Sequence, residues 1–166
     1  MIHHPDKVDK LSLVSPELLN FQEFQEDYIK LMTDYAMAVF LENKEGMISS
    51  LKTLNVTGKQ ERELDSNINS YVDSCLGAFV ESKNNIRRPG IMEFFPLKKT
   101  DAVSAPALIL YGEQDFDFVE KNSQKLEEVL SHAQLEKIPG SGHLVNLEQP
   151  DQFNKSLRDF LQKNQL

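Results

Sequence analysis

The sequence predicts an α/β protein that combines a small three-stranded parallel sheet with a helical insert. Near the start, and again after residue 100, short apolar runs are followed by segments of helical period, as in parallel strands joined by helices. From about residue 20 to residue 79, apolar residues recur at three- and four-residue steps, which is typical of helices. We therefore divide the chain into a partial α/β core, residues 1–16 and 100–166, and a helical insert, residues 17–99.

The first strand is expected at residues 10–14, which read Lys-Leu-Ser-Leu-Val. A short apolar run that stops at a proline, here Pro16, is typical of a strand. The polar segment just before it, Pro5-Asp6-Lys7, is interpreted as the exit from a preceding helix.

The insert is expected to contain two long helices and a short one. The first runs from about residue 21 to 41 after a capping box of Asn20 and Glu23, and the short one covers residues 47–54 after a break at Gly46. We interpret the aromatic and methionine stripe of the first helix as packing within the insert. A second capping box, Thr57 with Gln60, precedes a helix whose inward face we expect to include Cys75 as a buried residue, together with Leu64, Ile68, Tyr71, Val72, Leu76 and Phe79.

The last third of the chain alternates strand and helix. Residues 107–111 form a continuous apolar run between Pro106 and Gly112, which predicts a parallel strand buried on both faces. A helix over 118–130 and a strand over 134–138 follow. The final helix is expected over 148–161, with Pro150 in its first turn and Phe153, Leu157, Phe160 and Leu161 facing inward.

Composition excludes several classes of function. The net charge of -8 disfavours binding to nucleic acid or to anionic lipid surfaces, and no apolar run is long enough for a membrane span. We see no signal peptide and no Cys/His spacing typical of zinc, and the single cysteine, Cys75, fits a reducing, cytoplasmic setting. A polar loop at 82–90 carries Arg87-Arg88, which we interpret as solvated rather than as a site for anions.

Two polar residues follow the last two predicted strands. Asp115 comes after the 107–111 strand, and His143 comes after the 134–138 strand in Gly140-Ser141-Gly142-His143. Because neighbouring parallel strands lie about 5 Å apart, their loops meet at one edge of the sheet and can bring the carboxylate and the imidazole into hydrogen-bond reach. Such a carboxylate fixes the imidazole tautomer, which allows the other ring nitrogen to accept a proton from a nucleophile.

These segments resemble the α/β-hydrolase fold family. Residues 106–115 are similar to its seventh strand and acid loop, and residues 138–143 with 148–153 to its eighth strand, histidine loop and last helix. Residues 4–16 resemble its sixth strand. The resemblance implies that residues 17–99 are the family's helical cap. It also implies that Asp115 and His143 are the catalytic acid and base of an esterase-like hydrolase, acting on a small-molecule ester or related acyl compound without a cofactor or metal.

The family's nucleophile is not found in this sequence. No Gly-x-Ser-x-Gly pentapeptide occurs, and the elbow that carries it would fall before Met1, so we expect a truncated chain that supplies only the acid and the histidine. We weigh Asp117 as an alternative acid but prefer Asp115, because Gly-x-x-Asp places the latter at the turn. Serines considered as substitute nucleophiles, none of them favoured, are Ser15, Ser104, Ser123 and Ser141.

Three readings stay open at this point. The chain belongs to a hydrolase that is active when complete, or it is an inactive truncated product or binding remnant of the fold, or it is an unrelated small α/β binding domain. The third requires Asp115 and His143 to lie far apart. Loss of the strand next to residues 10–14 leaves an apolar edge, so we expect marginal stability or self-association through that edge. The exact substrate does not follow from the sequence.

Overall fold

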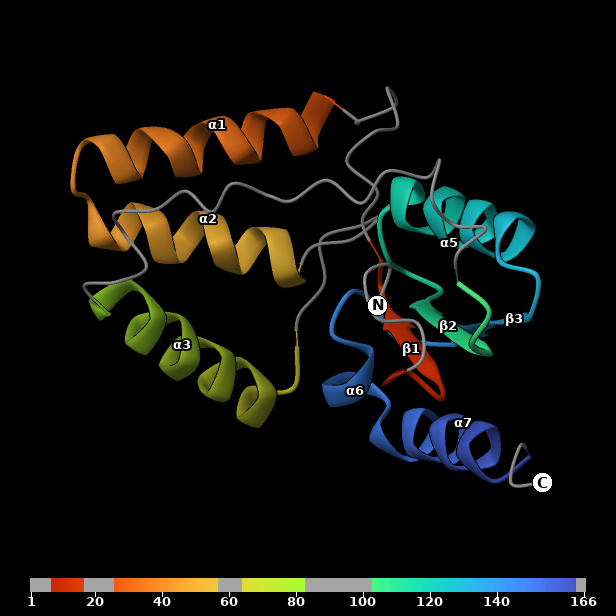
Figure 1. Ribbon diagram of the computed structural model, residues 1–166. Coiled ribbons are helices and arrows are strands. Elements are labelled where there is room, and N and C mark those ends of the chain that lie inside the picture. The colour runs from red at the N-terminus through yellow and green to blue at the C-terminus, as the bar shows by residue number, and fades with distance from the viewer. Residues whose placement is uncertain (1–6, 17–25, 57–63, 83–102, 164–166) are drawn as a thin grey trace. The chain divides into compact units, whose positions relative to one another are not determined.

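A computed structural model of the chain describes residues 7–16, 26–56, 64–82 and 103–163 (Figure 1). The chain divides into two compact units, residues 1–21 with 94–166 and residues 22–93. The domain boundaries expected from the sequence, near residues 16 and 99, adjoin segments outside the described residues. Whether the second unit is a cap stays a prediction.

The first unit is built on three parallel strands, as the sequence predicted. They are β1 (Leu11–Val14), β2 (Ala107–Gly112) and β3 (Ala133–Ile138), in the order β1-β2-β3. Leu13 of β1 pairs with Ile109 of β2, which pairs in turn with Leu135 of β3. Strand ends differ from the expected ones by a single residue.

Every residue of β2 is buried, because helices cover both faces of the central strand (Figure 1). On one face lies α5 (Asp117–Val129), and on the other lie the short α6 (Val145–Glu148) and α7 (Pro150–Lys163). Alternate residues of β2 serve the two sides: Ala107 and Ile109 pack with Leu126 and Leu130, while Leu108 and Leu110 pack with Ile138, Val145 and Phe160. The prediction of a strand buried on both faces is confirmed.

The expected final helix over 148–161 corresponds to α7, and the short α6, which was not expected, precedes it. Pro150 has no N–H to continue the helix of α6 and disfavours helical backbone at the residue before it, so Gln149 leaves the helical region at φ -133° and ψ 60°. Pro150 then begins α7, as expected. Phe160 is buried and Phe153 and Leu157 pack beside it, but Leu161, expected to face inward, is 46% exposed.

The second unit contains α1 (Glu26–Phe40), α2 (Lys44–Val56) and α3 (Ser66–Glu81). The three helices share a core of Ala38, Met47 and Val80, against which Tyr35, Val39, Ile48 and Leu51 pack. Tyr35 and Val39 of the expected α1 stripe therefore pack within the insert. The expected capping residues Asn20 and Glu23 lie outside the described residues, as do Phe21, Phe24 and Arg87-Arg88.

The expected break at Gly46 is wrong, because Gly46 lies in the first turn of α2. The break falls instead at residues 41–43, where Glu42 has a φ of 54°. The side chain of Asn43 accepts a hydrogen bond from the N–H of Gly46 at 3.0 Å, which satisfies a donor that the first helical turn leaves unpaired.

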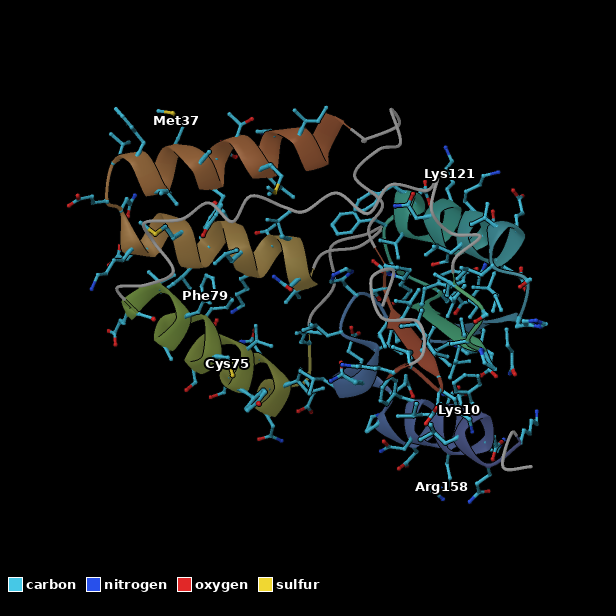
Figure 2. All side chains as sticks on the ribbon, viewed as in Figure 1. Lys10, Met37, Cys75, Phe79, Lys121 and Arg158 are labelled. Carbon is cyan, nitrogen blue, oxygen red and sulfur yellow. The ribbon has the colours of Figure 1, made fainter. Side chains whose placement is uncertain are left out.

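Helix α3 begins after Asp65, whose carboxylate accepts the N–H of Asn67. The Thr57 and Gln60 capping box lies outside the described residues. Val72 is buried as expected, and Val80, which was not expected on this face, is buried too. Cys75 is exposed, and Tyr71 and Phe79 are 59% and 44% exposed; Figure 2 labels Cys75 and Phe79 on this helix. The expected inward face was thus too wide, since the core takes up only a narrow stripe of the helix. No helix among the described residues has the length and hydropathy of a membrane span.

Candidate active site

The loops after β2 and β3 meet at the carboxyl edge of the sheet. The β2 loop turns at once, because the N–H of Asp115 donates to the carbonyl of Gly112 at 3.1 Å. The β3 loop turns at Gly140, whose φ of 67° favours glycine. Main-chain hydrogen bonds join the two loops: the N–H of Glu113 donates to the carbonyl of Ile138 at 3.0 Å, and that of Gln114 donates to the carbonyl of Ser141 at 2.8 Å.

Gly112 allows this close approach. A Cβ at this position would lie 2.2 Å from the carbonyl oxygen of Gly142 and 2.4 Å from that of Ser141. Both distances are far shorter than van der Waals contact. The glycine that ends β2 therefore lets the histidine loop pass directly against the strand end.

The two loops bring Asp115 and His143 together. Nδ1 of His143 lies 3.1 Å from Oδ1 and 3.3 Å from Oδ2 of Asp115. The carboxylate is 1% exposed, whereas the imidazole is 18% exposed. The contact expected from the sequence is present, and the reading that required these residues to lie far apart is excluded.

The surroundings of Asp115 fix its direction. Its Oδ1 accepts the N–H of Phe116 at 2.8 Å, which helps to hold the carboxylate beside Nδ1 of the imidazole. A carboxylate accepts only, so the nitrogen facing it carries the proton in this pair. The ring of Phe116 meets that of His143 edge-on at 6.5 Å between centroids. Phe116 thus adds an apolar wall beside the imidazole.

Side chains from two other elements reach the backbone around His143. The Glu148 carboxylate accepts the N–H of Gly142 at 3.2 Å and that of Leu144 at 3.1 Å. The Ser15 hydroxyl donates to the carbonyl of His143 at 3.1 Å. Neither role was predicted from the sequence, although an acidic residue only five positions after His143 pointed to the role of Glu148.

The other candidate residues lie elsewhere. Asp117, the alternative acid, is in the first turn of α5 and is not the carboxylate bonded to Nδ1. Ser104 is exposed, and Ser141 is buried with its hydroxyl donating to the carbonyl of Ile138. Ser123 is buried within α5. Ser15 has a φ of 45°, so its backbone is strained, but its hydroxyl donates to the main chain of His143.

A polar cluster of Tyr111, Glu120 and Lys137 lies beside the site, since Tyr111 directly precedes Gly112 at the end of β2. Its hydroxyl donates to Glu120 of α5 at 3.1 Å, and Lys137 of β3 donates to the same carboxylate oxygen. Burial raises the pKa of the Tyr111 phenol, and the Glu120 charge raises it further. The hydrogen bond to Glu120 also raises the pKa of Lys137. Within the described part of the chain, no group of three or more His, Cys, Asp or Glu residues is arranged to hold a metal.

Residues 1–150 match the family model described as alpha/beta hydrolase fold. The chain belongs to this family. It is 32% identical over 95 residues to epoxide hydrolase 3 of Xenopus tropicalis, a match that covers 57% of this chain and 25% of that protein.

Solved structures support the same fold. Carboxylesterase CesB (YbfK) of Bacillus subtilis superposes with a TM-score of 0.68 and 22% identity, over 98% of this chain and 54% of that one. The α/β-hydrolase MGS-M2, from a deep-sea metagenome of the Medee basin, gives a TM-score of 0.74 and 16% identity, over 99% and 60%. The chain therefore spans little more than half the length of these structures, and its match covers a quarter of the curated relative.

Proposed function

We propose that Asp115 and His143 are the acid and the base of a Ser-His-Asp hydrolase whose nucleophile lies outside this sequence. The observation that carries the proposal is the 3.1 Å contact between Nδ1 of His143 and the buried carboxylate of Asp115. Its position supports it too, because ligands of open α/β sheets bind at the carboxyl edge of the strands.

The mechanism follows from the roles of the two groups. Asp115 accepts the Nδ1 proton and thereby leaves Nε2 as the acceptor, so His143 takes the proton of the attacking hydroxyl as its oxygen bonds to the acyl carbon. The same proton then passes to the leaving alcohol oxygen as its bond to carbon breaks. Asp115 keeps its charge throughout and stabilises the imidazolium that forms between the two steps.

An ester or a related acyl bond in a small molecule is the proposed substrate class. The likeness to CesB, a carboxylesterase, favours an ester over other bonds. The likeness to epoxide hydrolase 3 makes an epoxide the second candidate. Enzymes for these two substrates differ in their nucleophile. In this family the nucleophile is carried by the elbow that precedes the segment resembling residues 4–16.

The first experiment treats this chain alone with a fluorophosphonate probe, which labels activated serines. We expect no more labelling of the native chain than of the heat-denatured chain, since the Ser15 hydroxyl donates to the main chain of His143 and the Ser141 hydroxyl to that of Ile138. Labelling that disappears on substitution of a serine of this chain would overturn the claim that the nucleophile lies elsewhere.

The second experiment begins with the coding sequence upstream of Met1 and the protein that it encodes together with this chain. If an in-frame Gly-x-Ser-x-Gly is present, hydrolysis of p-nitrophenyl acetate should fall about 10⁴-fold in Asp115→Asn and in His143→Gln. Asp117→Asn is the matched control, because this neighbouring acid lies in the first turn of α5 and is not the carboxylate at Nδ1, and it should keep its activity. Equal loss in both Asp variants would overturn the assignment, and an upstream stop codon would favour the inactive alternative.

We also propose that the helical insert, residues 17–99, is a cap that sets specificity. Its place in the chain between β1 and β2 supports this, as do exposed apolar side chains such as Phe40 and Tyr71. In the complete protein, Phe40→Ala with Tyr71→Ala should change the ratio of kcat/KM for long and short acyl esters. Lys155→Ala on α7 is the control, and an equal change there would contradict the cap role.

A further inference from the structure

We propose that Glu148 and Ser15 are positioning residues, which hold the backbone on both sides of His143 and so direct its imidazole at Asp115. The inference rests on the proposed function and deepens it, because it says how a residue on a loop keeps the geometry that proton transfer needs.

Glu148 holds the amide groups that flank the histidine. Its Oε1 lies 3.2 Å from the N–H nitrogen of Gly142 and 3.1 Å from that of Leu144, and its Oε2 lies 3.2 Å from the first of these. Hydrogen bonds from main-chain N–H groups to a carboxylate are stronger than those between neutral groups. Because Glu148 ends α6, the carboxylate ties the loop before His143 to the helix that follows it.

Ser15 holds the carbonyl of His143 from the opposite end of the sequence. Its hydroxyl donates to this oxygen at 3.1 Å across 128 residues, and its own N–H donates to Leu110 of β2 at 2.8 Å. The residue is therefore anchored to the sheet through its main chain and is 7% exposed. A φ of 45° is unfavourable for serine, by about 1 kcal/mol, and persists only where the surrounding structure imposes it.

Together these contacts fix the peptide units around the imidazole from two places, Ser15 just after β1 and Glu148 at the end of α6. The imidazole is carried by this backbone, so any shift of the histidine loop changes the distance between Nδ1 of His143 and the Asp115 carboxylate. In a catalytic group, a misplacement of about 1 Å can cost about 10²-fold in rate. The two residues thus act through the main chain around His143.

The test is the titration of the His143 imidazole by nitrogen-detected NMR in this chain, with its signals assigned by loss in His143→Gln. The Asp115 charge favours the protonated ring, so a longer contact lowers the titration midpoint. We expect Glu148→Ala and Ser15→Ala each to lower it by about half a pH unit.

Matched variants separate positioning from charge and from stability. Glu148→Gln removes the charge but keeps an oxygen at the Oε1 position, which accepts both N–H groups. Its His143 titration midpoint should therefore lie close to that of the unsubstituted chain. Ser15→Gly loses the same hydroxyl as Ser15→Ala but relieves the strained φ. It should therefore be more stable than Ser15→Ala, while its His143 titration midpoint stays as low as that of Ser15→Ala. Glu113→Ala is the loop control: it removes a bond to the N–H of Gly140 at 3.2 Å, away from His143, and should leave the midpoint unchanged.

The outcomes are distinct. A midpoint unchanged in Glu148→Ala and Ser15→Ala overturns the inference, as does a Glu148→Gln value equal to that of Glu148→Ala, which would mean that charge alone acts. Asp115→Asn serves as the reference and should lower the midpoint by about one unit. If this reference fails to respond, the proposed acid and base pair itself is wrong. If it responds while the positioning variants do not, only the present inference fails.

Discussion

Substitution of Gly112 by alanine tests how tightly the acid loop and the histidine loop fit together. The added Cβ would lie 2.2 Å from the oxygen of Gly142, 2.4 Å from that of Ser141 and 2.7 Å from the carbonyl carbon of Ser141. All three atoms belong to the main chain. They cannot rotate away as a side chain does, so the whole histidine loop has to move.

The size of the effect follows from these distances. Ordinary contact is about 3.5 Å, so the loop must withdraw by about 1 Å. Overpacking of this kind costs about 3 kcal/mol when backbone has to yield. The loop would also stretch the 2.8 Å hydrogen bond from Gln114 to Ser141, which adds about 1 kcal/mol. We expect the free energy of unfolding to fall by about 3–4 kcal/mol and the Tm by about 10 °C.

Two measurements report this change. Urea unfolding gives the free energy, and the NMR titration of His143 gives the state of its contact with Asp115, which a 1 Å withdrawal would lengthen well beyond the present 3.1 Å. Gly77→Ala is the control. A Cβ at Gly77, inside α3, meets nothing within 4 Å, so the same substitution there should stabilise the helix by about 0.5–1 kcal/mol.

The prediction is wrong if Gly112→Ala unfolds at the same urea concentration as the unsubstituted chain and His143 titrates as before. Such a result would mean that the loop adapts without strain and that the glycine is not needed for the close approach. Equal destabilisation by Gly77→Ala would show a general effect of the substitution rather than contact with the histidine loop.

Three further predictions concern stability and assembly. Ser123 is fully buried and its hydroxyl has no hydrogen-bond partner among the described residues, so Ser123→Ala should stabilise the chain by about 1 kcal/mol in urea unfolding, and a loss of stability would contradict this. The pKa values of Tyr111 and Lys137 are both raised, so the native chain keeps these protons to higher pH than the unfolded chain. The resulting stability is present below about pH 10 and lost as pH rises through the raised values. Thermal unfolding from pH 9 to 11 should show this decline, and Glu120→Gln should flatten it. Finally, β1 pairs only with β2 among the described residues, so we expect dimers through its other edge, and Val14→Lys should shift light-scattering masses toward the monomer. A monomer at all concentrations would count against that edge.

Much of the fold could be predicted because its signals are local. The apolar run from Ala107 to Tyr111 between Pro106 and Gly112 identifies a buried parallel strand without knowledge of its neighbours. Helix ends were less predictable. The break placed at Gly46 belongs at residues 41–43, and the side chain of Asn43, not a glycine, marks the start of α2. The prediction that Cys75 is buried was also wrong, since helical period does not say how wide a face the neighbouring helices cover.

The sequence by itself determined where the two candidate site residues lie relative to the strands. An acidic residue follows one parallel strand and a histidine follows the next, so both lie at the same edge of the sheet. Only the tertiary structure decided how that histidine is held. Ser15 and His143 are separated by 128 residues, and Glu148 bonds main-chain groups that no side-chain pattern reveals. Period and spacing report which face a residue occupies. They carry no information on which backbone atom a side chain meets, because that depends on how distant strands and loops pack.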